Sequence, residues 1–141
     1  PDEKALRNFT KHWFIHSPLY EALKLIAKQG ANIVITTDHG SIRVNRATQV
    51  VGDKDTSQTV RYKDGKNLTA NNKHAYYIKD PKSIGLPVKN IVENYIFAKE
   101  DYFFAYPNNY NHYVKYYKNT YQHGGISLEE MIIPCIIMEP K

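Results

Sequence analysis

The chain has 141 residues, of which 42% are hydrophobic, and a net charge of +5. This length and composition predict one globular domain, or part of one, with enough apolar residues to bury a core. No run of about 18 apolar residues occurs, which argues against a membrane-spanning helix, and no basic and then apolar leader precedes the first helix. The single cysteine, Cys135, argues against a disulfide framework and predicts a reducing, cytoplasmic setting. Because the sequence begins with Pro1, we expect a piece of a longer protein.

Two helices are predicted before the first strand. Residues 3–14 place apolar side chains at near-helical spacing. Ser17 and Pro18 then suit the N-cap and first position of a second helix, whose apolar stripe ends at Gly30. Residues 32–37 follow as a run of β-branched residues, which is typical of a central strand covered on both faces. A helix that leads into such a strand predicts an α/β fold with a mostly parallel sheet flanked by helices.

The composition changes between residues 41 and 94. Short alternating stretches are separated by turn signals, so we expect residues 41–94 to form a loop- and hairpin-rich insertion. Residues 95–106 predict a further hairpin. Ser127 and Glu130 have the spacing of a capping box that starts a short helix, and residues 132–138 predict a last buried strand.

Three side chains that can bind metal lie at the ends of predicted elements. Asp38 and His39 directly follow the strand at 32–37, and His123 precedes a glycine pair and the capping box. Active sites of α/β proteins form where strands end, and a mixed Asp and His ligand set suits zinc or manganese better than magnesium. The alternative, in which Asp38 caps a turn and His39 bonds to the backbone, stays open.

Other residues are weaker candidates for a site. Lys54, Arg61 and Lys66 form a small basic group suited to phosphate oxygens, although a solvated surface explains them equally well. His12 and His16 have the four-residue spacing of helical metal ligands. Because the helix ends directly after them, we favour a structural role for this pair.

Twelve tyrosines are present, and several alternate with lysine between Tyr113 and Tyr121. Such a surface can attract phosphates and stack on bases, which would predict nucleic-acid binding that weakens with salt. Half-exposed strands and helices have the same composition, so this interpretation and the structural one both stay open.

The segments at residues 36–40 and 122–134 resemble the PglZ branch of the alkaline phosphatase superfamily. The similarity extends to residues 13–19, 52–54, 61–63, 97–99 and 104–109, and it is strongest with the PglZ output domains of PorX-type response regulators. It covers nearly the whole chain.

The resemblance implies that residues 1–141 are the C-terminal portion of one domain with a partial alkaline phosphatase-like fold. It implies a site for two zinc ions, in which Asp38 and His39 hold one ion and His123 holds the other. The implied substrates are phosphate esters or cyclic or linear oligonucleotides. The nucleophile and the remaining ligands would lie upstream of Pro1, where the parent chain would also carry a receiver domain.

Two consequences follow for the chain alone. Its metal sites would be underfilled, so we expect it to be inactive, and its truncated sheet would favour a homodimer. The competing hypothesis is a signalling or interaction module that keeps the fold without the chemistry and binds nucleic acid through its basic, tyrosine-rich surface.

Overall fold

The computed structural model describes residues 2–53, 59–88 and 94–140 of the chain. The chain divides into two compact units. The terminal unit runs up to Thr37 and resumes at Pro134, and the central unit spans Asp38–Ile133. None of the described helices has the length and apolar character needed to cross a membrane.

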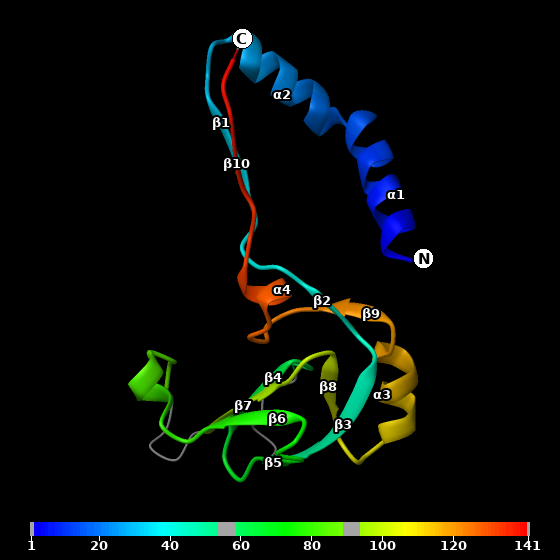
Figure 1. The fold of residues 1–141 in the computed structure, drawn as a ribbon, viewed down its shortest axis with the longest axis vertical. Helices are drawn as coiled ribbons and strands as arrows, with labels where there is room; N and C mark the ends of the chain where they lie inside the picture. The colour runs from blue at the N-terminus through cyan, green and yellow to red at the C-terminus, as the bar shows by residue number, and fades with distance from the viewer. Residues whose placement is uncertain (1, 54–58, 89–93, 141) are drawn as a thin grey trace. The chain divides into compact units, whose positions relative to one another are not determined.

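The terminal unit consists of two helices and a two-stranded sheet (Figure 1). Helix α1 spans Glu3–Ile15 and helix α2 spans Pro18–Lys28. Strand β1 (Ile33–Thr36) pairs with strand β10 (Cys135–Met138) in antiparallel register, with Ile33 opposite Met138. The first and last strands of the chain therefore lie side by side and run in opposite directions.

The predicted start of α2 is confirmed. Ser17 is the N-cap residue, its Oγ accepts a hydrogen bond from the Tyr20 backbone N–H at 3.2 Å, and Pro18 follows as the first helical residue. Proline suits this position because its missing N–H would have no partner inside the helix. The helix boundary is thus specified locally by the Ser-Pro pair.

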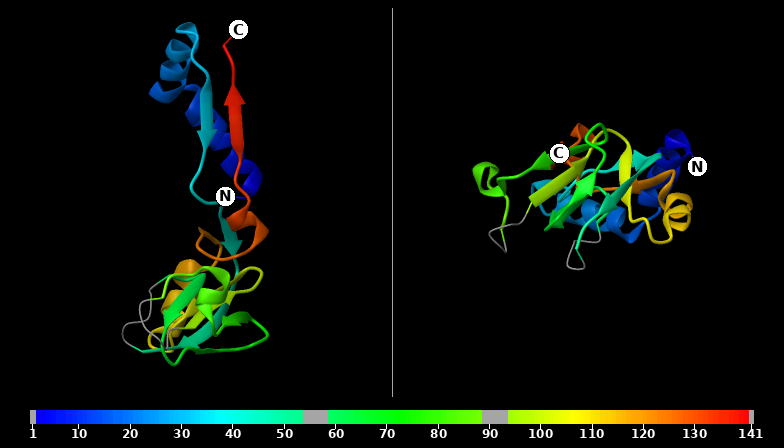
Figure 2. Two further views of the ribbon diagram at one scale, coloured as in Figure 1. Left: turned by 90° about the vertical axis from the view of Figure 1, so that its left-hand side faces the viewer. Right: turned by 90° about the horizontal axis from the view of Figure 1, so that it is seen from below.

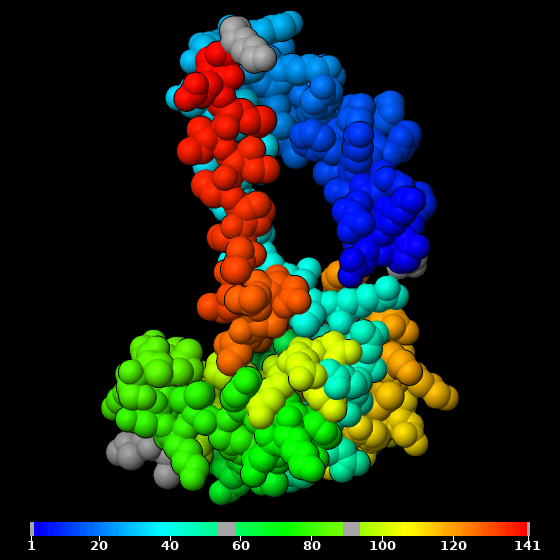
Figure 3. All heavy atoms as spheres, in the orientation of Figure 1, coloured from blue at the N-terminus to red at the C-terminus, as the bar shows by residue number. Residues whose placement is uncertain are grey.

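The strands of the terminal unit are more exposed than the sequence predicts. All four residues of β10 are exposed, and Figure 3 shows its atoms, in red, uncovered along one face. Among the described residues of this unit only Ser17 is buried. The prediction of a buried strand at residues 132–138 is therefore wrong for this chain, since β10 is covered on neither face. Helix α2 packs against β1, which explains why Ile33 and Ile35 are half-buried.

The central unit contains the other elements of the described chain. Its strands and helices are β2 (Ile42–Val44), β3 (Arg46–Val51), β4 (Tyr62–Gly65), β5 (Thr69–Ala70), β6 (Ala75–Ile78), the 3-10 helix η1 (Pro81–Ile84), β7 (Asn94–Ala98), β8 (Tyr102–Ala105), α3 (Tyr110–Tyr117), β9 (Thr120–Gln122) and α4 (Leu128–Met131). They form three small sheets with the orders β2-β9, β5-β3-β8 and β4-β7-β6 (Figures 1 and 2).

The expectation of a mostly parallel sheet is wrong. Among the described strands only β3 and β8 pair in parallel, and the other pairs are antiparallel. The prediction assumed that β1 belongs to a helix-connected parallel sheet, but β1 pairs with β10 from the far end of the chain. The fold has mixed α and β content with small sheets.

The hairpin predicted at residues 95–106 is half right. Both strands form, as β7 and β8, and Tyr102 N–H donates to the Lys99 carbonyl at 3.0 Å in the turn between them. The two strands do not pair with each other, because β7 pairs with β4 and β6, whereas β8 pairs with β3. Val60 precedes β4 and bonds to β8 through its carbonyl, which accepts from Phe104 N–H at 2.8 Å.

The buried apolar residues of the described chain all lie in the central unit. Most of them form two clusters, one of Val50, Leu68, Ala75, Ile96, Ala98 and Phe104, and one of Val44, Val60 and Phe103. Strand β8 joins them, because Phe103 and Phe104 are successive residues that point to opposite faces. The core of the central unit therefore fixes β8 from both sides.

Candidate metal-binding site

The structure brings two of the three predicted metal ligands, His39 and His123, into contact, and the third, Asp38, directly precedes His39 in the chain. The imidazole rings of His39 and His123 are stacked, with centroids 3.8 Å apart and an interplanar angle of 12°. His39 Nε2 lies 3.7 Å from Asp38 Oδ1. Residues far apart in the sequence thus meet at one place in the central unit.

The pairing of β2 with β9 explains this meeting. Ile42 at the start of β2 lies opposite Gln122 at the end of β9 in an antiparallel register. When that register is continued by one residue beyond each strand, His123 comes beside the segment that carries His39. The two histidines are therefore positioned by backbone pairing.

Two glycines permit close packing around these histidines. Gly40 N–H donates to the Glu130 carbonyl at 2.9 Å, and a Cβ at Gly40 would lie only 2.0 Å from the Glu129 carbonyl oxygen. A Cβ at Gly125 would lie 2.4 Å from a carboxylate oxygen of Glu130. The segments that follow His39 and His123 are thus both packed against α4, in a space that admits no side chain.

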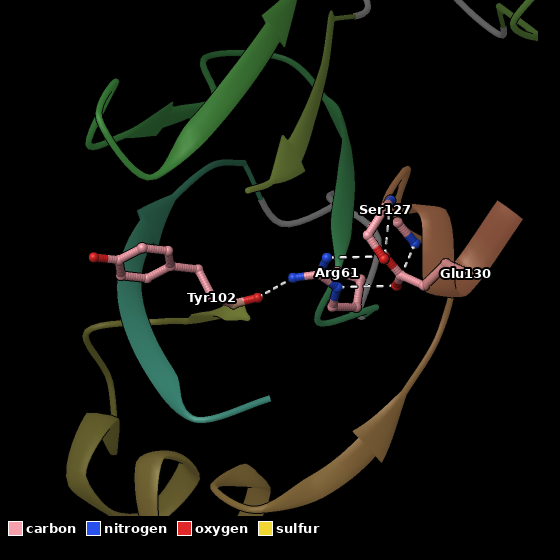
Figure 4. Close-up of polar contacts among 5 residues, drawn as sticks. Arg61, Tyr102, Ser127 and Glu130 are labelled. Carbon is pink, nitrogen blue, oxygen red and sulfur yellow. Dashed lines mark hydrogen bonds and ion pairs between the residues drawn. The ribbon is translucent and has the colours of Figure 1, made fainter. Parts of the chain in front are cut away.

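Glu130 in α4 organises the glycine segment after His123 (Figure 4). Its buried carboxylate accepts hydrogen bonds from the backbone N–H groups of Gly125 at 2.9 Å and Ser127 at 3.2 Å. The second bond belongs to the predicted capping box, which is confirmed. The bond to Gly125 extends the role of Glu130 to the backbone two residues after His123.

Arg61 is the counter-ion of the buried Glu130 carboxylate. Its Nε and Nη2 donate to the two carboxylate oxygens at 2.9 and 2.8 Å, and its Nη1 donates to the Tyr102 carbonyl (Figure 4). Both side chains are fully buried. Burial alone would raise the pKa of Glu130, but the Arg61 guanidinium, with smaller contributions from the Gly125 backbone and from Ser127, lowers that pKa below its usual value.

The remaining candidates from the sequence occupy different environments. Arg61 presents no exposed guanidinium to a ligand, because that group is held in the core by Glu130. Lys66 is exposed directly after β4, and Lys54 lies outside the described residues. The rings of His12 and His16 lie 4.5 Å apart between centroids at a tilted 55°, and both residues are exposed in the terminal unit.

The sequence did not identify Glu130 as a support of the site. Its capping box was a visible local signal, but the bond to Arg61 joins residues far apart in the chain, and no sequence pattern marked it. Lys63 was also missed. It is buried at 2% exposure, and the segment at residues 61–63, which belongs to the family resemblance, does not distinguish it from a surface lysine.

The geometry of the two imidazoles constrains how they can bind ions. Within residues 2–53, 59–88 and 94–140, no set of three or more His, Cys, Asp or Glu side chains is arranged to hold an ion. A ring nitrogen donates its lone pair in the plane of the ring, and nearly parallel planes do not converge on one point. His39 and His123 as placed here suit two neighbouring ions better than one shared ion.

Comparison with known protein families places this chain in the class of alkaline phosphatase-like domains. The matching family is the BREX system PglZ alkaline phosphatase-like domain, whose profile covers residues 5–138, and the chain therefore belongs to the PglZ family. No curated protein matches the chain.

Proposed function

We propose that this chain is the C-terminal portion of a PglZ domain whose intact parent is a zinc-dependent phosphodiesterase or phosphatase. Its substrates would be phosphate esters or linear or cyclic oligonucleotides. The observation that supports this proposal best is the contact of His39 with His123, with Asp38 beside His39, since these are the residues that the family resemblance assigns to metal.

Asp38 and His39 would share one ion. Zinc binds nitrogen and oxygen at about 2.0–2.2 Å, so two ligands of a tetrahedral ion lie about 3.4 Å apart. The 3.7 Å between His39 Nε2 and Asp38 Oδ1 is close to that separation. His39 Nδ1 lies 2.8 Å from the Gly40 carbonyl, a contact that favours a proton on Nδ1 and would make Nε2, the nitrogen nearer Asp38, the metal ligand.

His123 would hold the second ion. The ions of two-metal hydrolytic sites lie about 3.5–4 Å apart, and the stacked rings of His39 and His123 are separated by a similar 3.8 Å. Two such ions, when bound, would supply charge stabilisation for the oxygens of a phosphate ester. The role of this chain would be to orient its three ligands through the β2–β9 pairing and through the bonds of Glu130.

The exposed faces of the terminal unit support placement within a larger domain. The four residues of β10 are exposed, as are Leu19 and Leu25 of α2. Apolar residues on a two-stranded sheet are typical of strands that more of the same sheet would cover. The upstream part of the parent would then supply the nucleophile and the remaining ligands, and a receiver domain would make it a response regulator. Alternatively, a second copy of the chain would bury these faces in a homodimer.

Hydrolysis by the parent protein tests the proposal. With zinc, the wild-type parent should hydrolyse bis(p-nitrophenyl) phosphate or p-nitrophenyl phosphate, and His39→Ala and His123→Ala should each lower kcat at least 100-fold. The control is His112→Ala, which removes an exposed imidazole from α3 and should leave the rate unchanged. Equal rates for all four proteins would refute the assignment of the site.

A non-catalytic interaction module is the second candidate function. The observation in its favour is that the described residues contain no set of three ligands arranged to hold an ion. Exposed tyrosines of α3, with Tyr116 at 65% exposure, would provide a surface for nucleic acid. This function predicts a parent without hydrolytic activity that binds single-stranded oligonucleotides with an affinity that falls steeply with salt.

A further inference from the structure

A second candidate site lies in the central unit, around the buried side chain of Lys63. A pocket of about 220 Å³ is lined by Lys63, Val60, Phe104, Tyr106, Tyr113 and Tyr117. These residues come from β4 and the segment just before it, from β8 and the residue after it, and from α3. The pocket contains none of the three proposed metal ligands.

The positive charge of Lys63 is buried, which costs free energy of solvation. The residue is 2% exposed, and its Nζ lies 4.6 Å from the centroid of the Tyr106 ring, where the ring face attracts a positive charge. Burial lowers the pKa of Lys63 to about 8, although the neighbouring Asp64 carboxylate acts to raise it. A buried amine whose charge is disfavoured gains from an anion more than an exposed lysine does.

Aromatic rings form the other walls of the pocket. Tyr113 and Tyr117 lie one turn apart on α3, with ring centroids 6.3 Å apart and an interplanar angle of 16°. Tyr117 also packs edge-on against the buried Phe103 at 6.0 Å, which fixes its position, whereas Tyr113 is 38% exposed. The pocket thus has an anchored aromatic wall and an aromatic side chain that solvent can reach.

We propose that this pocket binds a small aromatic anion, a single ring that carries a phosphate or carboxylate group. The ring packs on the tyrosines and the anionic group faces the Lys63 amine. A neutral ring would forgo the attraction of the Lys63 cation, and a bare inorganic anion would make no use of the aromatic walls. The volume lies below the roughly 300–1,000 Å³ of pockets for drug-sized ligands, which suits one ring.

Isothermal titration calorimetry with the full chain tests this proposal. A chelator in the buffer removes metal ions, so the result does not depend on the proposed metal site. Phenyl phosphate and benzoate are the anionic probes, and the tighter of the two identifies the preferred group. Phenol and inorganic phosphate, each tested alone, should bind at least tenfold more weakly than that probe. Phenol binding as tightly as both anions, or no binding of either anion, would overturn the proposal.

Variants locate the site. Lys63→Met keeps the length of the side chain without its charge and should weaken the preferred probe at least tenfold, and Tyr113→Ala should weaken it about fivefold without disturbing the core. Lys79→Met is the matched control, because it removes an exposed lysine of the same unit outside the pocket. Should Lys63→Met fail to fold, Tyr113→Ala decides alone. Unchanged affinity in Tyr113→Ala, or in a folded Lys63→Met, would show that the probe binds elsewhere.

Discussion

Replacing Glu130 by glutamine should lower the free energy of unfolding of the central unit by about 3–5 kcal/mol. Both side chains of the Arg61–Glu130 pair are fully buried, so the substitution leaves a guanidinium charge in the core without its counter-ion. An amide would also place a donor opposite a donor of Arg61, and it would weaken the capping box, which contributes about 1 kcal/mol of that total. This is a large part of the stability of a chain of this size.

Urea denaturation followed by near-ultraviolet circular dichroism measures this change. Every tyrosine except Tyr20 lies in the central unit, so the tyrosine signal reports mainly on that unit. Glu100→Gln is the control, because Glu100 pairs with Arg46 at 70% side-chain exposure and its loss should cost less than about 1 kcal/mol.

A double variant distinguishes the effect of the buried ion pair from a general effect of disturbed packing. Changing both Arg61 and Glu130 to Met should restore much of the lost stability, because it removes both buried charges together. If Glu130→Gln costs no more than Glu100→Gln, the buried pair does not stabilise the central unit and the reasoning fails.

Three further predictions concern pH and backbone packing. The pKa of Glu130 is lowered on folding, so its stabilising contribution should be present above its unfolded pKa near 4.5 and should be lost as pH falls through the folded pKa. The free energies of unfolding of Glu130→Gln and wild type, measured in urea, should therefore converge at acid pH. Because the pKa of Lys63 is lowered from 10.5 to about 8, stability should rise by up to about 1.4 kcal/mol per pH unit between these values, and Lys63→Met should abolish that rise. Gly40→Ala should destabilise the central unit by more than about 2 kcal/mol, because its Cβ would lie 2.0 Å from the Glu129 carbonyl oxygen. Gly85→Ala should cost only about 1 kcal/mol, because a Cβ there would meet no atom within 4 Å and only the backbone φ of +76° is unfavourable for alanine. Equal effects of the two alanines on the urea midpoint would contradict the packing argument.

Features encoded by neighbouring residues could be predicted from the sequence. The start of α2 depends on the adjacent Ser17 and Pro18, and the capping box depends on Ser127 and Glu130, so the residue pattern alone specifies them. The meeting of His39 with His123 could not be worked out from their spacing. It was suggested by the family resemblance and depends on the pairing of β2 with β9.

Pairing between distant segments was the part that the sequence left open. The residues of β7 and β8 predict strands correctly, but nothing in them specifies β4, β6 and β3 as their partners. The antiparallel β1–β10 pair was missed for the same reason. Arg61 looked like a surface cation because its partner lies in another segment of the chain.

Metal analysis of the intact parent protein tests the central claim most directly. After zinc loading and removal of free metal, the wild-type protein should hold two ions per chain. His123→Ala should lose one ion, and the Asp38→Ala/His39→Ala double variant should lose the other, while His112→Ala keeps both. Two ions in every variant, or none in the wild type, would contradict the assignment of Asp38, His39 and His123 as metal ligands.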